Sequence, residues 1–152
     1  MRRVIAIGAT FMVVGLIAAI VDRPDPAFPG DSLWILQAPD TLTLYTVDFG
    51  GDGPDWPHTG ELAGYKTYAQ AEITDRNTQR QILVAIRHEI IPHPDRASGC
   101  FNPRIGLRAR RGGEEATLLI CFSCQYIEIK SGGLSKTSVI KGDSQELFDS
   151  TL

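Results

Sequence analysis

The longest apolar stretch of the chain lies close to its N-terminus. Val4–Val21 runs for 18 residues without a charged side chain and follows Arg2 and Arg3. At ~1.5 Å per residue a helix of this length spans roughly 27 Å, close to the ~30 Å hydrocarbon core of a bilayer. A cleavable signal peptide has a shorter apolar region and small residues before its cleavage site. The pattern therefore predicts a signal-anchor transmembrane helix over residues 1–21.

The charges on either side of this stretch predict its orientation. The two arginines precede it, whereas Asp22 and Asp25 are among the charges that follow it. Positively charged flanks stay in the cytoplasm, so we expect a single-pass cell-membrane protein with a cytoplasmic N-terminus and an exported C-terminal domain. The lipid bilayer is then its first partner. Secretion after cleavage of the signal is the alternative.

Beyond residue 40 the apolar positions become periodic. Alternating apolar and polar residues predict strands over 41–48 and 65–73. Isoleucines spaced four apart then predict an amphipathic helix over 76–91, capped by Thr74 or Asp75.

A pair of glycines at 112–113 predicts a tight hairpin turn. In a regular hairpin closed by that turn, opposed residues have numbers that sum to 225. This register places Leu107 opposite Leu118 on an apolar face and Arg104 opposite Cys121 on a polar one. One buried and one solvated face is what an antiparallel sheet requires.

These elements divide the chain into four parts. They are the transmembrane helix 1–21, a proline-rich spacer with a short element over 22–40, an exported domain over 41–130, and a flexible tail with a short C-terminal helix over 131–152. The predicted fold class is α+β: an N-terminal transmembrane helix followed by a small antiparallel sheet with one main helix packed on it.

Composition and charge narrow the function classes. The chain has 15 basic and 18 acidic residues, a net charge of -3, and 43% hydrophobic residues. That balance excludes a disordered chain and a strongly basic nucleic-acid binder, and we expect no nucleic-acid partner. It also argues against binding to anionic lipid through overall charge.

Three cysteines fall toward one end of the predicted hairpin. Extending the register places Cys100 level with Gln125, beside Cys124. Cys121 and Cys124 are three residues apart, so they point to opposite sides of a strand unless the chain bulges or turns between them. The interpretation we favour is a structural disulfide that joins Cys100 to one of the other two, in keeping with an oxidising compartment.

Other interpretations of the cysteines stay open. A zinc site would take its fourth ligand from His58, His88 or His93, but a second Cys or His pair is lacking, so no cofactor is expected. A redox Cys-x-x-Cys motif normally stands at a helix N-terminus, whereas Cys-Phe-Ser-Cys lies in a strand-rich run. Buried cysteines that act as small hydrophobic residues are the last alternative.

Arginines on the polar face of the hairpin are the second candidate feature. Arg104, Arg108 and Arg110 could together bind a carboxylate or a phosphate. The simpler interpretation is a solvated face partly neutralised by neighbouring acids such as Glu115. The candidate thiol and anion cluster therefore comprises Cys100, Arg104, Arg108, Cys121 and Cys124.

The same hairpin resembles an uncharacterised family of bacterial exported or membrane-anchored proteins. The family pattern reads Cys-aromatic-x-Pro-Arg-His-Gly-Ile-Arg, followed by Ile-Cys-Phe-x-Cys. The matching residues here are Cys100, Pro103, Arg104, Gly106, Arg108, Cys121 and Cys124. Ile105 stands where the family pattern has histidine, which removes a ligand or base from any inherited site. The family has no assigned activity, so the resemblance implies a shared domain and no more.

Motifs of common enzymes are missing from the chain. It contains no G-x-S-x-G, P-loop, H-E-x-x-H or dinucleotide-binding pattern, and no catalytic residues are predicted. We expect a membrane-tethered extracytoplasmic domain with a non-enzymatic binding or envelope-structural role and a protein partner in the cell envelope. The alternative is a thiol- or metal-dependent site built from the cysteines.

Overall fold

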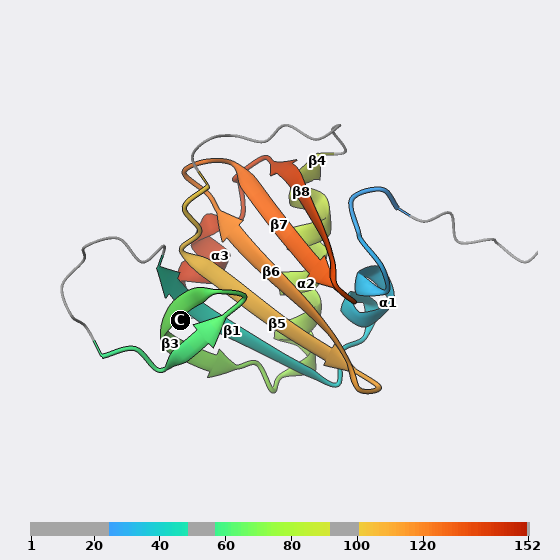
Figure 1. Cartoon of the computed structure of the whole chain (residues 1–152), viewed down its shortest axis with the longest axis horizontal. Coiled ribbons are helices and arrows are strands. Elements are labelled where there is room, and N and C mark those ends of the chain that lie inside the picture. The colour runs from blue at the N-terminus through green and yellow to red at the C-terminus, as the bar shows by residue number, and fades with distance from the viewer. Residues whose placement is uncertain (1–24, 49–56, 92–100, 152) are drawn as a thin grey trace, which may run out of the picture.

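A computed structural model describes residues 25–48, 57–91 and 101–151. In this part of the chain, eight strands form one antiparallel sheet accompanied by three helices (Figure 1). The elements are α1 Ser32–Gln37, β1 Thr41–Asp48, β2 Gly60–Leu62, β3 Tyr65–Glu72, α2 Arg76–Glu89, β4 Ile90–Ile91, β5 Ile105–Arg111, β6 Glu114–Cys121, β7 Tyr126–Ser131, β8 Leu134–Ile140 and α3 Gln145–Asp149. The strand order is β2-β3-β1-β5-β6-β7-β8-β4.

This architecture corrects the predicted fold class. The small sheet with one main helix was wrong, because the sheet has eight strands and the helices that accompany it are short. Within the described ranges no helix is long and apolar enough to cross a membrane. The predicted transmembrane helix over residues 1–21 lies outside the described residues.

Two turns that the sequence did not predict account for strands β7 and β8, and the last two residues of the helix predicted over 76–91 form β4. The chain beyond 113 forms two strands, β6 and β7, because it turns through 122–125. The next segment, predicted as a flexible tail, contains β8. Gly132 and Gly133 join β7 to β8 with φ of 57° and 79°, so they form a tight hairpin turn like the one at 112–113.

The local patterns gave the right elements elsewhere. β1 has the predicted bounds, and the β5–β6 hairpin has the predicted register, with Leu107 opposite Leu118. Helix α2 begins after Asp75, whose side chain accepts a hydrogen bond from the Thr78 backbone N–H at 2.7 Å. Alternation and helix capping are local signals, and they were sufficient for these elements.

The three helices contribute to the main core on one face of the sheet, and Figure 1 shows α2 running behind the strands. Isoleucines of α2, Ile35 of α1 and Phe148 of α3 meet the inward side chains of β1, β5, β6 and β7 there. A buried polar contact fixes the start of α2, because the Gln79 amide donates to the Ile73 carbonyl at 2.6 Å. A second contact fixes its end, because Glu89 Oε2 accepts from the Gly142 N–H at 2.6 Å.

A second, smaller core lies on the opposite face, under the β2–β3 hairpin. It contains Tyr45, Val47, Leu62 and Leu119. Gly106 of β5 makes the close approach possible, because the Leu62 side chain occupies the space that a Cβ atom at this position would need. The hairpin therefore covers one end of this face and leaves the rest of it to polar side chains.

Candidate functional site

A groove of about 310 Å³ lies between the end of α1 and the outer side of α2. Its lining residues are Leu36, Gln37, Ala38, Pro39, Arg76, Gln79, Arg80, Leu83, Val84 and Arg87. The α2 members recur at intervals of three and four residues, which places them along one side of the helix. The groove therefore combines apolar side chains with three arginines.

Among the described residues, the arginines of the groove form no ion pair with an acidic side chain. Arg76 Nη1 donates to the Pro39 carbonyl at 2.7 Å and to Gln79 Oε1 at 3.0 Å, so this arginine joins α2 to the segment after α1. Arg80 and Arg87 are exposed, and neither forms an ion pair with any acidic residue in the described ranges. The groove is thus cationic in a chain whose net charge is -3.

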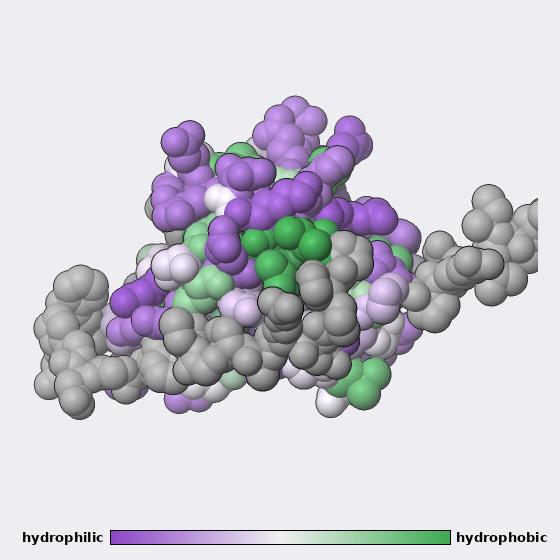
Figure 2. Space-filling model, turned by 90° about the horizontal axis from the view of Figure 1, so that it is seen from above, coloured by the Kyte–Doolittle hydropathy of each residue, from purple (hydrophilic) through white to green (hydrophobic). Residues whose placement is uncertain are grey.

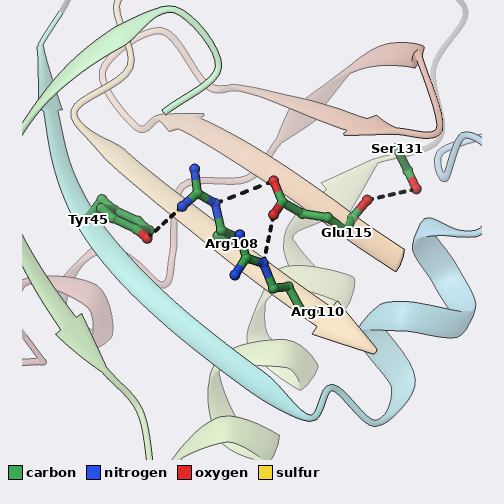
Figure 3. Close-up of polar contacts among 5 residues, drawn as sticks. All are labelled: Tyr45, Arg108, Arg110, Glu115 and Ser131. Carbon is green, nitrogen blue, oxygen red and sulfur yellow. Dashed lines mark hydrogen bonds and ion pairs between the residues drawn. The ribbon is translucent and has the colours of Figure 1, made fainter. Parts of the chain in front are cut away.

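The arginines predicted from the hairpin lie on the other side of the molecule and are paired. Figure 3 shows Arg108 and Arg110 reaching the two oxygens of Glu115, with Nε to oxygen distances of 3.4 and 2.8 Å. Arg108 Nη1 also donates to the Tyr45 hydroxyl at 3.2 Å. Arg104 pairs with Asp48 at 3.1 Å. An anion would have to compete with these carboxylates, so the sheet arginines make a weaker anion site than the groove does.

The predicted cysteines are brought together in part. Cys121 and Cys124 form a disulfide across the β6–β7 turn, with their Cα atoms 5.2 Å apart. The chain turns between them, as their odd spacing required. The predicted pairing was with Cys100, which lies outside the described residues. Cys121 ends β6 and is 1% exposed, whereas Cys124 is partly exposed.

Polar contacts surround the Cys121 sulfur. The Cys124 backbone N–H donates to Cys121 Sγ at 3.1 Å, and the Ser123 hydroxyl lies 3.4 Å from the same atom. A cavity of about 330 Å³ adjoins this turn. Its lining residues are Thr46, Arg104, Ile105, Phe122, Ser123, Gln145 and Asp149. Arg104 thus lines the cavity next to the disulfide, whereas Arg108 lies further along β5.

Metal binding receives no support from the described ranges. There, no group of three or more His, Cys, Asp or Glu residues is placed to hold a metal ion. Of the histidines considered as zinc ligands, His58 precedes β2 and His88 lies in the last turn of α2. His93 lies outside the described residues.

Two titratable groups have perturbed acidity. The pKa of Tyr65 is raised, mainly by burial and secondarily by the negative charge of Glu128. Tyr65 begins β3 and Glu128 lies on β7, so this charge acts on the tyrosine from another strand of the same sheet. The pKa of Asp75 is lowered, first by the hydrogen bond from the Thr78 hydroxyl and then by that from its backbone N–H.

Comparison with known proteins gives no match: no family model, no curated protein and no solved structure matches this chain. The resemblance of the hairpin to an exported bacterial family therefore stays a prediction.

Sequence reasoning missed the groove, although one signal for it was present. Arg76, Arg80 and Arg87 fall on one side of the predicted helix together with Val84, and Glu89 is the helix's only acidic residue. The negative net charge of the whole chain masks this local excess of positive charge. What the sequence could not provide was the opposite wall, because nothing local predicts that α1 packs beside α2.

Proposed function

We propose that the domain binds an anionic amphiphile, a phosphate or carboxylate group attached to a hydrocarbon chain, in the groove between α1 and α2. The observation that carries this proposal is the combination of Arg76, Arg80 and Arg87 with apolar side chains in one groove of about 310 Å³. That volume is at the lower end of the ~300–1,000 Å³ of small-molecule sites. Guanidinium groups match phosphate and carboxylate geometry, while the apolar wall provides contact for the chain.

Burial and exposure in the groove favour a ligand with two chemical parts. Leu36 and Leu83 are buried in the main core, so they offer a fixed apolar surface. Val84 stands in the sequence between the two outer arginines and is 48% exposed. A purely ionic ligand would leave this valine exposed to water, whereas a hydrocarbon chain would cover it.

The position of the groove along the chain supports a site near a membrane. Ser32, the first residue of α1, follows the end of the apolar segment Val4–Val21 by only eleven positions. Eleven extended residues reach at most about 40 Å. A domain attached to the membrane through this segment, with its C-terminal part exported, would hold the groove within reach of lipid headgroups. The role is then binding at the cell envelope, without chemistry on the ligand.

Calorimetric titration of the full chain in neutral maltoside micelles tests the proposal. We expect a saturable signal with dihexanoyl phosphatidylglycerol and none beyond dilution with dihexanoyl phosphatidylcholine, which has the same acyl chains and no net charge. Titration with decanoate, a fatty acid, tests a free carboxylate in place of the phosphate. Comparing the two affinities shows whether the groove prefers a phospholipid headgroup or a fatty acid. Equal signals from the two phospholipids would contradict a site that selects for negative charge.

Paired variants locate the site. Each cation near a lipid surface contributes about 1 kcal/mol, so Arg80→Gln with Arg87→Gln should weaken binding about thirty-fold. Both side chains are exposed, so folding should be little affected. Arg104→Gln with Arg110→Gln removes the same charge from the sheet and should leave affinity within about twofold. An equal loss in both double variants would show that net charge, and not the groove, governs binding.

A further inference from the structure

The disulfide between Cys121 and Cys124 occupies a turn that is already held by other bonds. Six positions of β6 pair with β7, from Ala116 opposite Ser131 to Cys121 opposite Tyr126. The Gln125 N–H closes the turn by donating to the Phe122 carbonyl at 3.1 Å. The disulfide closes a loop of only three residues' separation, and a short loop constrains the unfolded chain least. The sheet therefore does not depend on this bond for its register.

The two sulfurs of the bond have different surroundings. Cys121 is 1% exposed, whereas Cys124 is partly exposed in the turn. An attacking thiolate therefore reaches Cys124 more readily than Cys121. In that attack Cys121 is the leaving group, so its surroundings determine how easily the bond breaks.

Hydrogen-bond donors converge on the leaving sulfur. The Cys124 N–H points at Cys121 Sγ from 3.1 Å. The Ser123 hydroxyl lies 3.4 Å from it and must be the donor, because a disulfide sulfur carries no proton. Both donors gain strength when that sulfur becomes a thiolate, since hydrogen bonds to a charged acceptor are stronger. They stabilise the reduced form relative to the disulfide, which makes the disulfide more oxidising.

We propose that Cys121–Cys124 is a redox-active disulfide that accepts two electrons from a protein dithiol. The partner's thiolate attacks Cys124 Sγ, the bond to Cys121 breaks, and its electron pair leaves on Cys121 as a thiolate. The partner's second thiolate then attacks its own sulfur of the mixed disulfide and releases Cys124 as a thiolate. The partner is oxidised to a disulfide, the Cys121–Cys124 pair is reduced, and the two protons of the partner dithiol are returned to the released thiolates or to solvent.

The cavity beside the turn provides room for the partner's chain. Phe122 and Ser123 line it from the turn itself, and Arg104 lines it with a side chain that is 65% exposed. A segment flanking the partner's reactive cysteine can occupy this space. The inference does not depend on the arginine groove, so either can fail alone.

Equilibration of the full chain with reduced and oxidised glutathione tests the proposal, in a Cys100→Ser background that removes the third thiol. Thiols are trapped by alkylation and counted by mass, while circular dichroism follows the sheet. We expect reversible reduction of the pair with an unchanged spectrum. A disulfide that resists excess reduced glutathione until the chain unfolds would overturn the proposal and leave the bond with a structural role.

Single substitutions identify the attacked sulfur. In the Cys100→Ser background, and at a pH at which both thiols are ionised, Cys124 in a Cys121→Ser variant should form the mixed disulfide with oxidised glutathione about tenfold faster than Cys121 in a Cys124→Ser variant, because it is more accessible. Equal rates, or a faster reaction at Cys121, would contradict the order of attack.

A substitution that retains both cysteines tests the role of the donors. Loss of the Ser123 hydroxyl in Ser123→Ala should slow reduction by glutathione about five- to tenfold, as expected for the loss of one hydrogen bond of ordinary strength. Ser135→Ala is the matched control, because that hydroxyl donates to Glu128 on the same sheet. An unchanged rate in Ser123→Ala would show that the hydroxyl does not stabilise the leaving thiolate.

Discussion

The docking of α3 on the main core gives the most direct stability prediction. Phe148 is the only residue of this five-residue helix that is fully buried, at 0% exposure. Its ring lies 5.5 Å from that of Phe122, centroid to centroid. Removing a buried phenylalanine side chain typically costs about 3–5 kcal/mol, of which an aromatic pair accounts for about 0.5–1.5 kcal/mol. Phe148→Ala should therefore lower the free energy of unfolding by about 3–5 kcal/mol.

Urea denaturation followed by circular dichroism measures this change. The urea concentration at the midpoint of unfolding should fall, while the slope of the unfolding free energy against urea concentration stays constant. The melting temperature should drop by roughly 10–20 °C for a domain of this size. Val84→Ala is the control, because that side chain is 48% exposed and should cost under about 0.5 kcal/mol. A loss under about 1 kcal/mol for Phe148→Ala would refute the docking of α3.

Two further predictions concern acidity. Because the folded pKa of Asp75 lies below its ordinary value of 3.8, its stabilising effect is present above pH 3.8 and is lost as the pH falls through the lowered pKa. Asp75→Asn keeps a capping side chain that does not titrate. In urea denaturation at decreasing pH, the free energy of unfolding of this variant should therefore fall less than that of the wild type. An equal fall in both proteins would contradict this. Because the pKa of Tyr65 is raised above 10.0, its contribution is present below pH 10.0 and is lost as the pH rises through the folded pKa. Glu128→Gln should lower the pKa of Tyr65 without restoring its ordinary value, because the burial of Tyr65 remains. Ultraviolet titration, with Tyr65→Phe as the reference that lacks this group, measures the pKa. An unchanged pKa in Glu128→Gln would exclude the charge of Glu128 as a cause.

Much of the fold followed from local patterns, and the errors have local causes too. The alternation in β1 and the Gly-Gly turn before β6 gave correct strands because each signal lies within a few residues. The β6–β7 turn has no glycine or proline, and its left-handed residue is Gln125 with φ of 58°. An apolar run that continues through such a turn looks like one strand. The glycines before β8 predict a flexible tail, although they make the tight turn that joins two strands.

The candidate sites depended on contacts between distant segments. Arg104 and Asp48 are 56 positions apart, so the sequence could supply the arginine but not its partner. The disulfide was misassigned because the position of the turn decides which cysteines can meet. The charge of α2 could be predicted, whereas the groove requires α1 to be packed against it. On the face seen in Figure 2 a hydrophobic patch borders hydrophilic side chains, and the sequence alone does not predict which side chains meet at the surface.

The hairpin over Gly106 also has a consequence for local motions of the sheet. Where Leu62 lies against β5, the strands are covered on both faces, by this hairpin and by the main core. Backbone amides there can exchange with solvent only when most of the domain opens. The edge strand β4, which pairs with β8 at only two positions, can open at much lower cost. The turn that carries Cys121–Cys124 continues from β6 beside this covered region, so we expect a change in its sulfur chemistry to leave the strands beneath it intact.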